Sequence, residues 1–175
     1  PLRIFAIYTL LKQQGAAMLE EIIKQSGFER WFLHQMLQQI EIEQSISNTG
    51  SPEKLTKDLL LDAKRIGLSD LRIARLLSVE EESVTEERAK HHIDPCYHMV
   101  DTCAGEFRAS TPYFYSTWGE IDEGTPIGKQ GVIILASGPN RIGQGLEFDT
   151  CCTLASPAFQ HQGRKTILIN SNPEA

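Results

Sequence analysis

Residues 138–152 (GPNRIGQGLEFDTCC) combine three glycines with a dense set of polar side chains. A short apolar, β-branched stretch at 131–137 precedes this run and a helical pattern follows it, which predicts a strand, a loop and a helix. Glycines permit a sharp turn and a close approach of a ligand, and the N-terminus of a helix favours a negative charge. The residues alone leave two interpretations open: structural packing and a small-anion site.

The glycine loop does not fit the two common nucleotide-binding motifs. A phosphate-binding P-loop ends in Gly-Lys-Ser or Gly-Lys-Thr, and no such pair follows Gly145. An NAD-binding fold places an acidic residue after its second strand, where this chain has Asn170 and Asn172. No nucleophile stands beside a base in a recognisable pattern, so the sequence predicts no catalytic residues in this chain.

Residues 68–84 resemble a helix-turn-helix, which would indicate a DNA-binding regulator. Five glutamates between positions 80 and 87 would face the DNA phosphates, and the formal net charge of the chain is −6. Binding to nucleic acid or to an anionic membrane normally needs a basic face. We therefore expect a helical hairpin packed in a core, with neither nucleic acid nor membrane as a partner.

A group of histidines and cysteines near the middle of the chain raises the question of a metal site. Its members are His91, His92, Cys96, His98 and Cys103. Their spacing matches no common zinc pattern, and histidines near the end of a helix are explained by its partial negative charge. We predict no metal site, and the absence of a spanning or signal segment predicts a cytoplasmic protein.

Helical periodicity runs from about residue 2 to about residue 92 and predicts about six helices. The first carries an apolar stripe at Leu2, Phe5, Ala6, Thr9 and Leu10. Ser51 and Pro52 are typical of a helix start, as is Ser69 before the helix predicted at about 70–77. From 131 onward the pattern is strand, loop, helix and strand, with the two strands parallel. The predicted domains are 1–103, mainly α-helical; 104–130, a connecting segment with one short strand; and 131–175, a truncated α/β unit.

The run at 138–152 closely resembles a hallmark of the carbamoyl-phosphate synthetase large chain. Other parts of the chain are similar to the central region of that family, namely residues 30–33, 100–104, 106–107, 113–117 and 166–174. The resemblance covers essentially the whole chain. It implies a helical oligomerisation domain followed by the first β-α-β unit of a Rossmann-like pre-ATP-grasp domain, so that the chain is expected to be a piece of a larger protein.

The resemblance also implies a function for the parent protein. That family makes carbamoyl phosphate from bicarbonate, ammonia from glutamine and two ATP, with magnesium or manganese, for arginine and pyrimidine biosynthesis. A small glutamine amidotransferase subunit is its partner, and the helical part is expected to self-associate. The ATP sites belong to other domains, so no cofactor site is expected here and the chain alone should be inactive.

Three residues of the glycine run are implied to line the tunnel through which carbamate travels. Gly145 and Glu147 match tunnel-lining positions of the family, and Arg141 lies close to them in the sequence. An alternative from another class is an autonomous helical scaffold whose α/β tail binds a small anion. The DNA-binding regulator is the less favoured second alternative.

Overall fold

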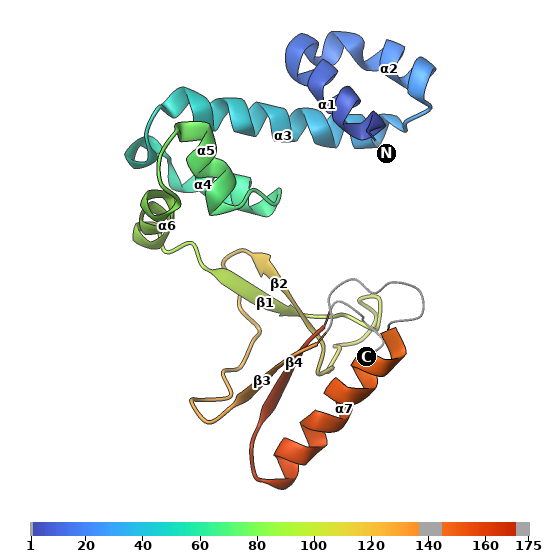
Figure 1. Cartoon of the computed structure of the whole chain (residues 1–175), viewed down its shortest axis with the longest axis vertical. Helices are drawn as coiled ribbons and strands as arrows, with labels where there is room; N and C mark the ends of the chain where they lie inside the picture. The colour runs from blue at the N-terminus through green and yellow to red at the C-terminus, as the bar shows by residue number, and fades with distance from the viewer. Residues whose placement is uncertain (1, 137–144, 171–175) are drawn as a thin grey trace. The chain divides into compact units, whose positions relative to one another are not determined.

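The computed structural model describes residues 2–136 and 145–170, and all of their side chains except those of 145–148. The chain divides into two units between residues 124 and 125. The first unit contains α1 (Arg3–Gln14), α2 (Leu19–Ser26), α3 (Arg30–Thr49), α4 (Lys57–Arg65), α5 (Asp70–Leu77), α6 (Glu81–Lys90), β1 (Pro95–Met99) and β2 (Phe114–Trp118) (Figure 1). The second contains β3 (Val132–Leu135), α7 (Gly145–His161) and β4 (Thr166–Ile169). This order confirms a mainly α fold followed by a partial α/β unit.

Side-chain caps set where two of the helices begin. The Ser69 hydroxyl oxygen accepts a hydrogen bond from the Arg72 amide at 3.1 Å, which confirms the start predicted for α5. The expected helix start at Ser51 is wrong, because Pro52–Lys54 forms only a short 3₁₀ turn. The chain then extends through Leu55, whose side chain is buried, and α4 begins at Lys57 with Thr56 as its cap.

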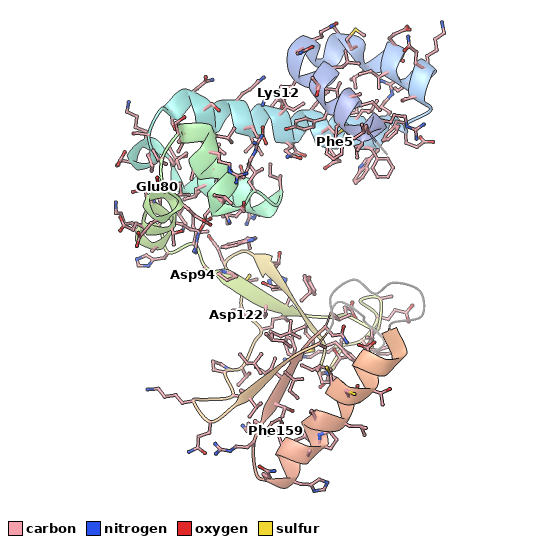
Figure 2. All side chains as sticks on the ribbon, in the orientation of Figure 1. Phe5, Lys12, Glu80, Asp94, Asp122 and Phe159 are labelled. Carbon is pink, nitrogen blue, oxygen red and sulfur yellow. The ribbon has the colours of Figure 1, made fainter. Side chains whose placement is uncertain are left out.

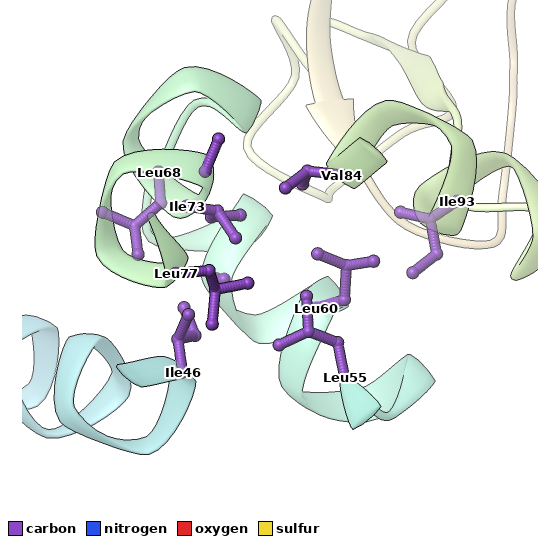
Figure 3. Packing of buried hydrophobic residues seen from close by; sticks show 10 residues of the cluster. Ile46, Leu55, Leu60, Leu68, Ile73, Leu77, Val84 and Ile93 are labelled. Atoms are coloured by element: carbon purple, nitrogen blue, oxygen red, sulfur yellow. The ribbon is translucent and has the colours of Figure 1, made fainter. Parts of the chain in front are cut away.

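Helix α3 carries both hydrophobic clusters of the first unit. At one end of the helix, Leu33, Leu37 and Ile40 pack against apolar side chains of α1 and α2. At the other end, Ile46 enters the cluster formed with α4, α5 and α6, whose members include Leu55, Leu60, Ile73, Val84 and Ile93 (Figure 3). α3 therefore acts as the common support of the two helical groups (Figure 1).

The apolar stripe predicted on the first helix is not the face that α1 buries. Ile7 and Leu11 enter the core, whereas Leu2 and Phe5 are 74% and 66% exposed. Successive helical residues are about 100° apart, so positions 7 and 11 face a different direction from position 5. α1 thus has two apolar faces, and within this chain only one of them is covered.

Strands β1 and β2 form an antiparallel hairpin that the sequence analysis anticipated only in part. β2 lies in the segment expected to hold one short strand, and β1 was not expected. Cys96 pairs with Thr117 and His98 with Tyr115. The Cys96 side chain is buried.

A cluster of charged side chains centred on Asp70 joins four elements of the first unit. The Asp70 carboxylate accepts hydrogen bonds from Lys64 Nζ of α4 at 2.7 Å and from Arg88 Nε of α6 at 3.0 Å. The Thr85 hydroxyl donates a third bond at 3.2 Å. The two cations also lie over the ring of Trp118 in β2, with Lys64 Nζ 4.6 Å and the Arg88 guanidinium carbon 5.4 Å from its centre. We call this group the Asp70 cluster.

A second charged group lies where α1, α3 and α5 meet. Glu43 of α3 is only 2% exposed and accepts three hydrogen bonds of 2.8 to 2.9 Å from Arg72 of α5. Lys12 of α1 lies 3.6 Å from the same carboxylate. Burial, together with the charge of Glu43, raises the pKa of the Tyr8 phenol nearby. The buried carboxylate is therefore neutralised by cations from two other helices.

Asp70→Asn should destabilise the first unit, because it removes the carboxylate that binds the buried Lys64 and the partly buried Arg88. Removing one partner of a buried pair typically costs several kcal/mol, so we expect a loss of about 3 kcal/mol in the free energy of unfolding at pH 7. Urea unfolding followed by circular dichroism measures it. Asp62→Asn is the matched control, since the Asp62 side chain is 59% exposed and lies 3.9 Å from Arg65. Equal effects of the two variants would contradict the role given to the cluster.

The same cluster predicts an acid limit to stability. Burial by itself would raise the pKa of Asp70, but the hydrogen bonds and charges of Lys64 and Arg88 outweigh it and hold the pKa below its ordinary value of 3.8. Such a carboxyl stabilises the fold above its unfolded pKa, and this stabilisation is lost as the pH falls through the folded pKa. The stability difference between the native chain and Asp70→Asn should therefore shrink below about pH 4. A difference that is constant down to pH 2 would contradict this.

Candidate functional site

The candidate site lies at the edge of the second unit where its two strands end and α7 begins. β3 and β4 pair in parallel, with Val132 opposite Thr166 and Leu135 opposite Ile169. The Ala136 amide continues the ladder by donating to the Ile169 carbonyl at 2.9 Å. Because parallel strands end at the same edge of a sheet, the segment between β3 and α7 starts beside the end of β4. This edge of an α/β sheet is where ligands usually bind.

Polar side chains attach α7 to β4 at two levels. Near the start of the helix, the Asn170 amide nitrogen donates to Asp149 Oδ1 at 2.8 Å. Further along, the hydroxyl oxygens of Ser156 and Thr166 lie 2.7 Å apart, and Gln160 donates to both of them. The first contact holds the start of α7 at the carboxyl end of β4, and the second holds its later turns at the first residue of β4. The sequence analysis placed Asp149 in the polar run 138–152 and Asn170 after the second strand, but it did not predict that they bond to each other.

One face of the two-stranded sheet is covered by α7 and the other is exposed. The contact between Ser156 and Thr166 places Thr166 on the helix side. The alternate residues point the other way and are 41% to 75% exposed, namely Ile133, Leu135, Ile167 and Ile169. Parallel strands normally have both faces covered. In this chain, therefore, the apolar face opposite α7 is left uncovered.

The structure describes the three predicted site residues to different extents. Gly145 is the first residue of α7, and Glu147 lies in its first turn. The side chain of Glu147 is outside the described part, and Arg141 falls in the segment 137–144, which is not described. Their role at the tunnel therefore stays a prediction.

Two of the histidines considered for a metal site contact backbone carbonyls. His98 Nε2 lies 3.0 Å from the carbonyl of Ile121, and His91 Nε2 lies 3.2 Å from that of Leu55. Within 2–136 and 145–170, no group of three or more His, Cys, Asp or Glu side chains could hold a metal ion. All four cysteines lie in these ranges and are free thiols. In the same part of the chain, no helix has the length and apolar character needed to cross a membrane.

Comparison with known families assigns both units. The family model of the carbamoyl-phosphate synthetase large chain oligomerisation domain matches residues 1–92. The model of the carbamoyl phosphate synthase preATP-grasp domain matches residues 128–175, which include the corner described above. The chain belongs to the carbamoyl-phosphate synthetase large-chain family. The resemblance drawn from the glycine run is thereby confirmed.

Individual relatives agree with this assignment. The chain is 43% identical over 174 residues to the arginine-specific carbamoyl phosphate synthase large chain of Arabidopsis thaliana, a chloroplastic protein. It is 44% identical over 174 residues to the carbamoyl phosphate synthase large chain of a Nostoc species. Each match covers 99% of this chain. The chain spans only 14% and 16% of the length of these two relatives.

Asn170→Ala should loosen the first turns of α7, because it removes the hydrogen bond that joins them to the end of β4. One such bond contributes about 1 kcal/mol. Amide hydrogen exchange of α7 measures the effect, and we expect faster exchange at 149–152 in the variant. Gln162→Ala is the control, since Gln162 is exposed beyond the end of α7. Unchanged exchange at 149–152 in Asn170→Ala would show that the bond does not hold the helix.

Proposed function

We propose that this chain serves as the central segment of the large subunit of a glutamine-dependent carbamoyl-phosphate synthetase. Such an enzyme is an ATP-dependent ligase that makes carbamoyl phosphate from bicarbonate, ammonia released from glutamine and two ATP, for arginine and pyrimidine biosynthesis. The observation that carries the proposal is the succession of the two family matches along one chain, 1–92 and then 128–175. The Arabidopsis relative named as arginine-specific supports the arginine branch.

The proposal assigns partners and cofactors to the parent protein. A small glutamine amidotransferase subunit supplies ammonia, and the helical part of this chain contributes to self-association. In this proposal, ATP and magnesium or manganese bind in other domains of the parent, as the resemblance to the family implies. This chain alone is then inactive. A cytoplasmic location and the absence of nucleic-acid binding stay predictions, and the Arabidopsis relative is chloroplastic.

Within the parent, this segment borders the path of carbamate between the two synthetic sites. Gly145 stands at the first position of α7, beside the carboxyl end of the sheet. A residue without a side chain leaves room for a small molecule, and the start of a helix favours an anion. Glu147 and Arg141 supply a polar lining, which suits carbamate better than an apolar wall. None of these residues acts as a catalyst in this scheme.

Gly145→Phe in the parent enzyme tests the tunnel. A bulky side chain at this position should block carbamate, so ATP hydrolysis should continue while carbamoyl phosphate formation falls at least tenfold. The ratio of ATP consumed to carbamoyl phosphate formed, measured with the small subunit present, should rise well above two. Gly145→Ala is the control for loss of backbone freedom and should keep the ratio near two. An unchanged ratio in Gly145→Phe would contradict the tunnel role.

A further inference from the structure

Helix α7 meets the neighbouring strand β4 along one face. Asp149 bonds to Asn170, the residue that follows β4. Ser156 and Gln160 both contact the hydroxyl of the first residue of β4. Spacings of seven and four residues place all three on one face of a helix with about 3.6 residues per turn. Gly145 lies four residues before Asp149 and therefore heads this same face.

A proline divides α7 between these contacts. Pro157 lies inside the helix and has no amide hydrogen, so it cannot bond to the carbonyl four residues earlier. Helices bend most readily at such a point. Behind the proline, the Phe159 carbonyl accepts hydrogen bonds from the amides of Gln162 at 3.0 Å and Arg164 at 3.1 Å. Figure 2 shows Phe159 on the last turns of α7, so this terminal turn and the contacts with β4 hold the rear part.

The front part of α7, residues 145–153, is held by the bond between Asp149 and Asn170. Asn170 Nδ2 donates to Asp149 Oδ1 at 2.8 Å, and both side chains are partly buried. A hydrogen bond to a carboxylate is stronger than one between neutral groups. The carbonyl of Ile169 accepts from the Ala136 amide at 2.9 Å, so β3 ends at the same point. One bond therefore joins the front part of α7 to the place where both strands end.

The length of the front part makes the position of Gly145 sensitive to this bond. With a rise of about 1.5 Å per residue, Gly145 lies about 18 Å and Asp149 about 12 Å from Pro157 along the helix. If the front part turns about the proline, Gly145 moves roughly one and a half times as far as Asp149. A misplacement of about 1 Å can lower a rate by about 100-fold. The bond at Asp149 therefore determines where Gly145 stands.

We infer that Asp149 and Asn170 are positioning residues for the transfer of carbamate. Their bond keeps the front part of α7 against the end of β4 and so fixes the width of the path beside Gly145. A front part that turns about Pro157 either narrows this path or opens it to water. In both cases carbamate fails to reach the second site after ATP has been hydrolysed to make it. The inference rests on the tunnel role in the proposed function and adds the residues that hold the wall in place.

Reversal of the bond tests the inference in the parent enzyme with its small subunit. Asn170→Asp sets two carboxylates against each other, so the ATP consumed per carbamoyl phosphate should rise about twofold or more. Asp149→Asn combined with Asn170→Asp reverses donor and acceptor and should bring this ratio back near two. Gln162→Ala is the control, since Gln162 is exposed beyond the end of α7, and should keep the native ratio. A loss of folded enzyme alone would lower ATP hydrolysis and product formation together and leave the ratio unchanged.

Pro157→Ala tests the hinge. It supplies the missing amide hydrogen and a residue of high helix propensity, so the front part should no longer turn freely. Asn170→Asp should then raise the ratio less in the Pro157→Ala background than in the native one. An equal rise in both backgrounds would overturn the movement about the proline.

An unchanged ratio in Asn170→Asp overturns the inference, as does a raised ratio that the reversed pair of side chains does not lower. Gly145→Phe separates this result from the proposed function. A raised ratio in Gly145→Phe with a native ratio in Asn170→Asp removes the positioning role and leaves the tunnel intact. A parent protein that forms no carbamoyl phosphate contradicts the proposed function instead. Amide hydrogen exchange at 149–152 in this chain then decides the positioning role: it should be faster in Asn170→Asp and return to the native rate in the reversed pair.

Discussion

The first unit depends on the neutralisation of charges that its fold has buried. Asp70 is the first residue of α5, where the helix dipole favours an acid, and it binds one cation from α4 and one from α6. The side chains of Lys64 and Arg88 are only 7% and 16% exposed, so each would be costly to bury without this carboxylate. Because both cations also lie over the ring of Trp118, the same cluster places the hairpin β1–β2 against the helices. Packing of α4, α5, α6 and β2 thus shares one electrostatic centre.

α3 extends this arrangement to the other group of helices. Its buried Glu43 forms ion pairs with Arg72 of α5 and Lys12 of α1. Because Glu43 lies between the two hydrophobic clusters along α3, these ion pairs connect the two groups of helices. α1 is held by its inner face, Ile7 and Leu11, and its outer stripe stays free. The family model that matches this part of the chain is that of an oligomerisation domain.

Sequence reasoning was most successful where the signal is local. Ser69 as a helix cap and the family motif at 138–152 depend on neighbouring residues, and the pairing of β3 with β4 followed from the strand–helix–strand order. It failed where contacts between distant residues determine the local structure. β1 forms by pairing with β2, and α4 starts later than expected because Leu55 enters the core in an extended segment. Periodicity located an apolar stripe on α1 but could not tell which of two apolar faces α2 and α3 would cover. The roles of Gly145, Glu147 and Arg141 depend on other domains of the parent, so neither local pattern nor this structure determines them.

A double-mutant cycle tests the central claim, that the Asp70 cluster is the common centre of the helices and the hairpin. Asp70→Asn and Trp118→Leu are combined, and the free energy of unfolding is measured for the native chain, both single variants and the double variant. If the carboxylate holds the two cations over the indole ring, the double variant should lose less stability than the sum of the single losses, by about 1 kcal/mol. Losses that add within about 0.3 kcal/mol would contradict the account.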